Sequence, residues 1–168
     1  MVMKKFLRFI DKIFVPRIAY AHCDIPCGIY DPHEAQMAAH TVLRMTQMIN
    51  ELNIDSVKGL GSKNIIHQLS RMQRVKEDHA EIVKHQIRVI WGDYFKSEHL
   101  DKYKDLNELV FKIMKTASLV KQDINETASN ELIKLTQDFA EIFWTIKDKK
   151  TKRVASGYPT EGDIVVPA

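Results

Sequence analysis

The sequence predicts an all-α fold, an antiparallel up-down-up-down four-helix bundle. The chain has 168 residues, which is enough for one domain with a single core. Its six glycines and five prolines suit long helices better than a turn-rich all-β fold. Four segments carry apolar residues at the spacing of one helix face, and a bundle is the simplest way to bury four such faces.

The first helix is predicted to begin at Asp31-Pro32-His33-Glu34. These residues offer an N-cap, a proline at the first helical position and a glutamate at the third, as in a capping box. Lys58-Gly59-Leu60-Gly61 then ends the helix. The apolar face between these two signals consists of Ala35, Ala38, Val42, Met45, Ile49 and Leu52.

The second helix is predicted to be capped by Ser62 and to end near Trp91-Gly92, with His79 on or beside its apolar face. We expect residues 93–101, which include Tyr94 and Phe95, to connect two helices and to cover one end of the core. The apolar face of this helix consists of Ile65, Leu69, Met72, Val75, Ile82 and Val89.

The third and fourth helices are separated by capping residues at 123–126. From about Lys149 the helical periodicity is lost, and Ser156-Gly157-Tyr158-Pro159 is typical of a flexible tail. The apolar face of the third helix consists of Leu106, Leu109, Ile113, Ala117 and Val120, and that of the fourth of Ala128, Leu132, Leu135, Phe139, Ile142 and Ile146.

Positive charge is concentrated at the amino end of the chain. Residues 1–21 carry a formal charge of +4 against +3 for the whole chain, which leaves −1 for residues 22–168. A near-neutral body lacks the positive footprint that binding to a phosphate backbone requires, so nucleic acid is not an expected partner. No apolar stretch approaches the length of about 20 residues that crosses a bilayer, so we expect a soluble protein without a membrane partner.

Residues 1–21 end in Ala19-Tyr20-Ala21, which looks like a signal peptidase site. An export signal also requires an uninterrupted apolar region, and here four charged residues interrupt it. The pattern favours a pro-segment that a peptidase removes and a cytoplasmic protein over an exported one. The interrupting residues are Arg8, Asp11, Lys12 and Arg17.

Cys23 and Cys27 are the only cysteines, and they directly follow His22. Two cysteines so close together are too few for a disulfide scaffold, which leaves a metal site, a redox thiol pair or chance. A free amino terminus at His22 creates a specific donor set: its amine nitrogen, the deprotonated amide nitrogen of Cys23 and the Cys23 sulfur close two adjacent chelate rings. Cys27, brought round by a turn at residues 26–28, completes a plane of two nitrogens and two sulfurs.

A planar set of nitrogen and sulfur donors suits nickel(II) or copper(II), whereas zinc prefers a tetrahedron. The imidazole of His22 can add a fifth, axial ligand. Strong anionic donors bring the reduction potential of a nickel(III)/nickel(II) couple into a biological range, so the expected site is redox-active. Cleavage before His22 is a requirement, because an acylated nitrogen is no longer an amine donor.

The run His22-Cys23-Asp24-Ile25-Pro26-Cys27-Gly28-Ile29-Tyr30-Asp31-Pro32 resembles the nickel hook of the nickel superoxide dismutases. The similarity continues through Trp91-Gly92-Asp93-Tyr94-Phe95-Lys96 and Phe143-Trp144 to about Lys147. It implies a homohexamer of four-helix bundles, with each hook docked against neighbouring subunits and one nickel ion per subunit. It also implies the reaction, in which nickel cycles between two oxidation states while one superoxide is oxidised to oxygen and another is reduced to hydrogen peroxide.

The resemblance also implies a role for individual residues. His22, Cys23 and Cys27 are the implied nickel ligands, and Tyr30 and Tyr94 are the implied gate that controls access and orders water. The remaining implied residues are Asp24, which stabilises the hook, Pro26, whose preceding bond is cis in the family, and Lys96 and Lys121, which align with lysines that could steer superoxide.

Two positions depart from the family pattern. Ala38 and His79 stand where the family often has a glutamate and an arginine that hold the axial imidazole. His79 either takes over part of that role or is a core histidine bonded to a nearby backbone or side-chain group. These departures motivate an alternative function, a non-enzymatic helical module in which Cys23 and Cys27 sense oxidation or carry metal.

These observations divide the chain into three parts. Residues 1–21 are the predicted pro-segment, residues 22–148 the metal-binding hook plus the four-helix bundle, and residues 149–168 the flexible carboxy-terminal tail.

Overall fold

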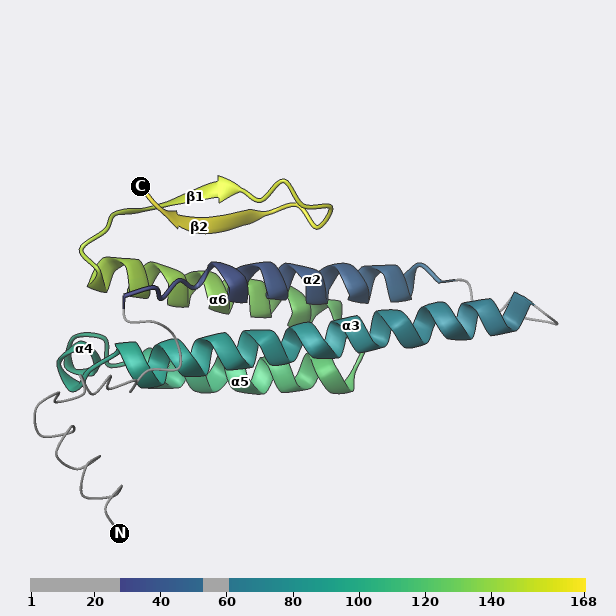
Figure 1. Cartoon of the computed structure of the whole chain (residues 1–168), viewed down its shortest axis with the longest axis horizontal. Coiled ribbons are helices and arrows are strands. Elements are labelled where there is room, and N and C mark those ends of the chain that lie inside the picture. Colours follow the sequence, from purple (N-terminus) through teal and green to yellow (C-terminus); the bar gives the residue numbers. More distant parts are fainter. Residues whose placement is uncertain (1–27, 53–60) are drawn as a thin grey trace, which may run out of the picture.

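The computed structural model describes residues 28–52 and 61–168 of the chain (Figure 1). Its long helices are α2 (His33–Asn50), α3 (Gly61–Val89), α5 (Leu106–Gln122) and α6 (Glu126–Ile146). A short π-helical turn, η1 (Ile90–Tyr94), and the short helix α4 (Ser97–Lys102) join α3 to α5. Two strands follow α6, β1 (Thr151–Ala155) and β2 (Asp163–Pro167).

The four long helices form the predicted bundle. Each one contacts the next along the chain, α3 packs on α5 across the η1–α4 connection, and α2 closes the ring by packing on α6 (Figure 1). In α3 the core face is formed by Ala80, Val83 and Ile87, and of the face predicted for this helix only Val89 is buried. In α2, α5 and α6 the deeply buried apolar side chains come mainly from the predicted faces, and the four packed helices confirm the all-α bundle. The buried side chains of these three helices include Val42 of α2, Ile113 of α5, and Leu132 and Phe139 of α6.

Two helix starts follow the predicted capping chemistry. The Asp31 carboxylate accepts a hydrogen bond from the His33 amide at 2.8 Å, and the Asn125 side chain accepts one from the Ala128 amide at 2.9 Å. Glu34 does not complete a capping box, because its carboxylate accepts a hydrogen bond from the Gln86 side chain of α3 at 2.6 Å. It ties α2 to α3 instead.

Residues beyond Lys149 form a β-hairpin, and the prediction of a flexible tail was wrong for this segment. β1 and β2 pair antiparallel, with Thr151 opposite Pro167 and Ala155 opposite Asp163. The turn between them uses positive φ angles at Gly157 and Gly162, of 70° and 72°. Five-residue strands with little alternation carry a weak sequence signal, and a lone hairpin is marginal in water. Its order depends on what it packs against.

The hairpin lies across α2 and α6, and buried polar side chains of those helices bind its backbone (Figure 1). Gln36 makes two hydrogen bonds with Val165, donating to the carbonyl at 3.0 Å and accepting from the amide at 2.7 Å. Gln137 donates to the Asp163 carbonyl at 2.6 Å. These amides complete the hydrogen bonding of β2 on the side that faces the bundle, as a neighbouring strand would.

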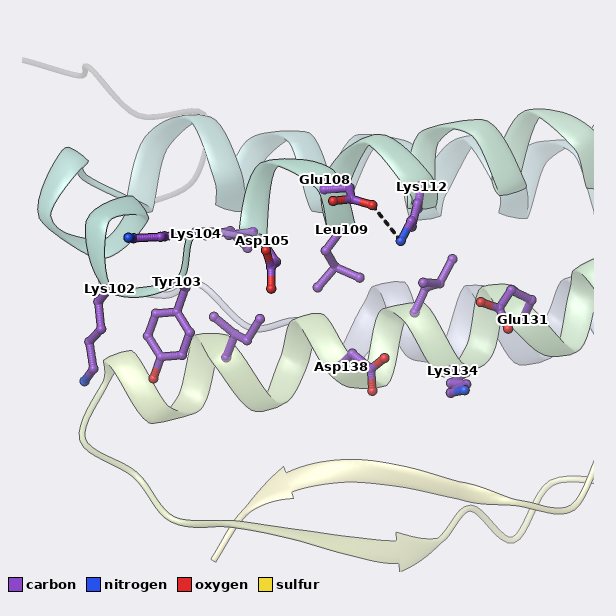
Figure 2. A pocket seen from close by; sticks show the side chains of 13 residues that line it. Lys102, Tyr103, Lys104, Asp105, Glu108, Leu109, Lys112, Glu131, Lys134 and Asp138 are labelled. Carbon is purple, nitrogen blue, oxygen red and sulfur yellow. Dashed lines mark ion pairs between the residues drawn. The ribbon is translucent and has the colours of Figure 1, made fainter.

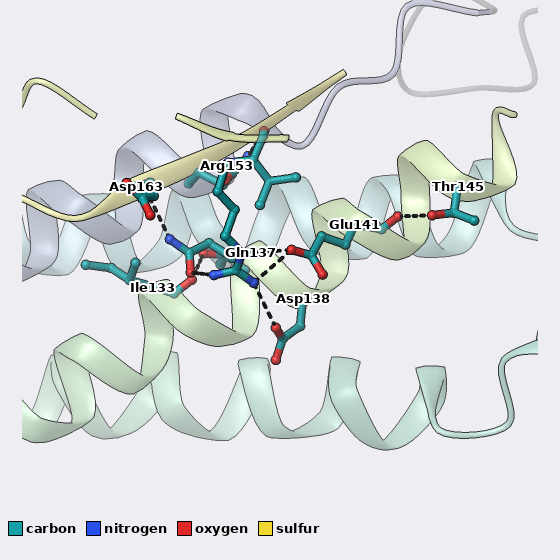
Figure 3. Close-up of polar contacts among 10 residues, drawn as sticks. Ile133, Gln137, Asp138, Glu141, Thr145, Arg153 and Asp163 are labelled. Carbon is teal, nitrogen blue, oxygen red and sulfur yellow. Dashed lines mark hydrogen bonds and ion pairs between the residues drawn. The ribbon is translucent and has the colours of Figure 1, made fainter. Parts of the chain in front are cut away.

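Arg153 of β1 holds the hairpin to α6 from the solvent side (Figure 3). Its guanidinium donates to the Gln137 side-chain oxygen at 2.8 Å and to the Glu141 carboxylate at 2.9 Å. It also lies 3.7 Å from the Asp138 carboxylate. Because Gln137 in turn donates to Asp163, one chain of polar contacts links α6 to both strands.

His40 of α2 is the third buried group that binds the hairpin. Only 3% of its surface is exposed, although its sequence context does not distinguish it from the other histidines. Its Nδ1 lies 2.8 Å from the Thr160 hydroxyl and its Nε2 lies 3.3 Å from the Asp163 carbonyl. Burial lowers the pKa of His40 below the usual 6.5, against an opposing effect of the Asp163 carbonyl.

The substitution His40→Leu is expected to lower the free energy of unfolding by about 1–3 kcal/mol, since it leaves hairpin groups without their partner.

A second prediction concerns the pH dependence of stability. Because the pKa of His40 is lower in the folded chain than in the unfolded chain, the unfolded chain binds a proton at this residue first as pH falls through 6.5. The free energy of unfolding therefore decreases progressively below pH 6.5, and His40 has no such effect above it. Denaturant unfolding of wild type and His40→Gln at pH 5.5 and 7.5 checks this, and an equal loss of stability on acidification in both proteins would contradict it.

Candidate metal centre

The five predicted hook residues, His22, Cys23, Asp24, Pro26 and Cys27, lie outside the described residues. The described part of the chain begins at Gly28, directly after the hook. Gly28 has φ of 89°, a conformation that favours glycine, and the chain then enters the bundle at Tyr30. Within residues 28–52 and 61–168, no group of three or more histidine, cysteine, aspartate or glutamate side chains could hold a metal ion.

Tyr30 and Tyr94 lie side by side, although 64 residues separate them in the sequence. Their ring centroids are 5.7 Å apart, with an angle of 51° between the ring planes. Tyr30 is buried with 5% of its surface exposed, whereas Tyr94 is half-buried. The bundle therefore places one tyrosine from the end of the hook against another from the π-helical turn η1.

Tyr94 is held in a cluster of aromatic rings at one end of the bundle. Its ring centroid lies 5.0 Å from that of Phe143, 5.7 Å from that of Phe95 and 6.2 Å from that of His99. Burial, with a smaller contribution from the Asp148 carboxylate, raises the pKa of the Tyr94 phenol above 10. The phenol consequently stays protonated at neutral pH and is available as a hydrogen-bond donor.

The two lysines that the sequence predicts to steer superoxide differ in their surroundings. Lys96 is exposed, two residues after Tyr94, and precedes α4. Lys121 is paired with the Glu81 carboxylate at 2.6 Å, so its charge is compensated where it lies.

The two departures from the family pattern lie inside the bundle. Ala38 is 2% exposed and is part of the apolar core, so it offers no polar group to an imidazole. The Nδ1 of His79 lies 2.8 Å from the Val75 carbonyl, one turn back along α3. Fifteen residues of helix separate His79 from Tyr94, which is about 20 Å along the axis. The structure does not bring His79 to the tyrosine pair of its own chain.

A separate groove of about 850 Å³ lies between α5 and α6 (Figure 2). Both signs of charge line it, and Glu108 and Lys112 form an ion pair at 2.8 Å across one turn of α5. Neither Tyr30 nor Tyr94 lines this groove. It is a solvated, charged surface depression and offers no chemistry for a redox metal.

The chemistry of the hook donors can be tested against nickel. Two thiolates, an amine and a peptide nitrogen would supply soft sulfur donors and nitrogen donors, a type of ligand set that suits nickel(II). The only cysteines of the chain are in this segment, and the described residues offer no competing cluster. The donor set of residues 22–27 therefore fits nickel.

Residues 17–147 match the family model of the nickel-containing superoxide dismutases. A superoxide dismutase [Ni] of Streptomyces coelicolor is 30% identical over 139 residues, which are 82% of this chain and 98% of the relative. A superoxide dismutase [Ni] of Streptomyces seoulensis matches with the same identity and coverage. The hairpin lies beyond the family match.

Solved structures agree with these matches. The native structure of a nickel superoxide dismutase superposes with a TM-score of 0.65 and 32% sequence identity, covering 76% of this chain and 99% of that one. A structure whose nickel ligation corresponds to the oxidised state also superposes with a TM-score of 0.65, at 31% identity. The alternative function as a thiol sensor or metal carrier finds no support among these relatives.

The sequence, the bundle and these relatives thus agree on both the fold and the chemistry. The chain belongs to the nickel-containing superoxide dismutase family, whose members are oxidoreductases that use nickel to convert superoxide to oxygen and hydrogen peroxide.

Proposed function

We propose that the nickel of this enzyme is held by His22, Cys23 and Cys27 after removal of residues 1–21. The observation that carries the proposal is the contact between Tyr30 and Tyr94, because it places two phenol rings where the chain leaves the hook. Bound in the hook, nickel supplies a one-electron couple between Ni(III) and Ni(II). One superoxide gives up an electron and a second takes one up with two protons.

The residues of the chain contribute binding, orientation and access. The His22 amine and imidazole, the Cys23 amide nitrogen and the Cys23 and Cys27 thiolates would hold the metal. Asp24 stabilises the hook by hydrogen bonding, and Pro26 helps to close its turn. Tyr30 and Tyr94 form the gate, because their rings exclude bulk water and the protonated Tyr94 phenol can donate a hydrogen bond to water or to an approaching anion.

Residues 1–21 act in this proposal as a pro-segment that a peptidase removes in the cytoplasm. Their removal is a chemical requirement for the amine donor at His22. Lys96 adds positive charge on the surface near Tyr94, which favours the approach of superoxide. His79 lies about 20 Å from Tyr94 along the helix axis. Its predicted supporting role would therefore suit a hook that comes from another subunit of the homohexamer that we propose.

Intact mass spectrometry with metal analysis tests the proposal. The active protein is expected to begin at His22 and to carry one nickel per chain, and a variant whose pro-segment cannot be cleaved is expected to bind nickel far more weakly. Sedimentation of the processed protein is expected to give the mass of six chains. An active enzyme that retains residues 1–21, or that is active without nickel, would overturn the assignment of the hook.

A further inference from the structure

Lys147 reaches back from the end of α6 to the start of the bundle. Its ammonium nitrogen donates a hydrogen bond to the Tyr30 carbonyl at 3.3 Å, a contact between residues 117 positions apart. The same nitrogen lies 5.7 Å from the ring centroid of Tyr94, 5.0 Å from that of Phe143 and 5.4 Å from that of Trp144. One cation therefore contacts the backbone of one gate tyrosine and the ring of the other.

The contacts of Lys147 are more than those of a solvated surface lysine. Its side chain is half-buried, and within residues 28–52 and 61–168 no carboxylate lies at ion-pair distance from it. Lys149 and Lys150, which lie just beyond it, are both exposed. A cation held over aromatic rings and partly removed from water is attracted by the ring quadrupoles, and this attraction fixes its position.

The position of the Tyr30 carbonyl matters because Tyr30 follows the last predicted nickel ligand, Cys27, closely along the chain. Two residues separate Cys27 from Tyr30. The three steps from one Cα to the next span at most about 11 Å. A contact that fixes the Tyr30 backbone therefore limits where Cys27 can lie relative to Tyr94. A metal site whose ligands sit on a short segment loses affinity when that segment must be ordered on binding.

We propose that Lys147 is a positioning residue for the nickel hook. It fixes the point at which the hook joins the bundle and holds that point in register with Tyr94, so that the hook needs less ordering when it binds metal. The proposal rests on the assignment of nickel to residues 22–27. It assigns Lys147 no contact with substrate or metal.

The test compares Lys147→Met with Lys147→Arg and with the matched control Lys149→Met, each as the processed protein that begins at His22. Methionine keeps the length of the side chain and removes both the donor and the charge, whereas arginine keeps both. Nickel affinity is measured by competition with a chelator, and unfolding by denaturant is measured on the same metal-free samples. Should Lys147→Met fail to fold, Lys147→Gln, which keeps a neutral donor, takes its place.

We expect Lys147→Met to weaken nickel binding by about tenfold or more, in the range seen when groups that orient metal ligands are removed. Lys147→Arg is expected to retain most of the affinity and Lys149→Met all of it, and metal-free Lys147→Met is expected to stay folded with a modest loss of stability. Equal nickel affinity in Lys147→Met and Lys149→Met would overturn the proposal. Wild-type protein that binds no nickel at residues 22–27 would instead refute the hook, so the two failures are distinguishable.

Discussion

Replacement of Cys23 or Cys27 by serine is expected to abolish nickel binding and superoxide dismutation while leaving the bundle folded. Serine is isosteric but does not supply a thiolate at neutral pH. The nickel would therefore lose one sulfur ligand and the electron donation that lowers its Ni(III)/Ni(II) reduction potential. Loss of groups that merely orient a ligand already costs about 10- to 100-fold in metal affinity. Loss of a direct ligand should cost more.

The measurement combines metal analysis with superoxide decay and far-ultraviolet circular dichroism. His67→Gln is the matched control, because it removes an exposed potential ligand of α3 far from the hook in sequence. We expect the control to keep nickel and activity, and both cysteine variants to keep the helical signal. Dismutation at the wild-type rate in either serine variant would show that the metal is held elsewhere.

The largest expected effect on stability comes from Phe143→Ala. Phe143 is fully buried and contacts Tyr94, Phe95 and Trp144, with its ring centroid 5.0 Å from those of Tyr94 and Trp144. Truncation of a buried phenylalanine costs about 3–5 kcal/mol, as lost burial and a cavity add together. The same change removes the surface against which Tyr94 rests, so activity should fall along with stability.

The matched control is Phe111→Ala, since Phe111 is 60% exposed on α5. Its truncation should change the free energy of unfolding by no more than about 0.5 kcal/mol. Denaturant unfolding of the two variants and of wild type measures both effects. Similar losses in the two variants would mean that the aromatic cluster does not stabilise this end of the bundle.

Periodicity located the four long helices because each of them buries one face, but it did not find the buried face of α3, where Val83 and Ile87 lie in the core. Val42, Ile113 and Phe139 all lie in the core, as their spacing predicted. The same criterion missed Lys76, which is 2% exposed and donates to the Asp123 carbonyl at 2.6 Å. Its polarity gave no sign of a buried position, which the Asp123 carbonyl just after α5 and the charges of the Glu77 and Asp123 carboxylates make tolerable.

The hairpin shows the limit of local patterns. Nothing in residues 151–167 indicates that Gln36, His40 and Gln137, between 14 and more than 100 residues away, would bind the hairpin through their side chains.

Within the part of the chain described by the structure, no helix combines the length and the apolar composition that a membrane crossing needs. This agrees with the pattern of charged residues along the sequence.

The sequence by itself determined the four helices and the family, and it predicts the donor atoms of the hook. All three depend on residue types at short, fixed spacing, and covalent geometry carries such information directly. Only the tertiary structure decided that Tyr30 meets Tyr94, that Lys147 joins them and that the carboxy-terminal segment folds onto α2 and α6. These contacts join residues far apart in the chain, and they exist only once the apolar faces of the helices have packed.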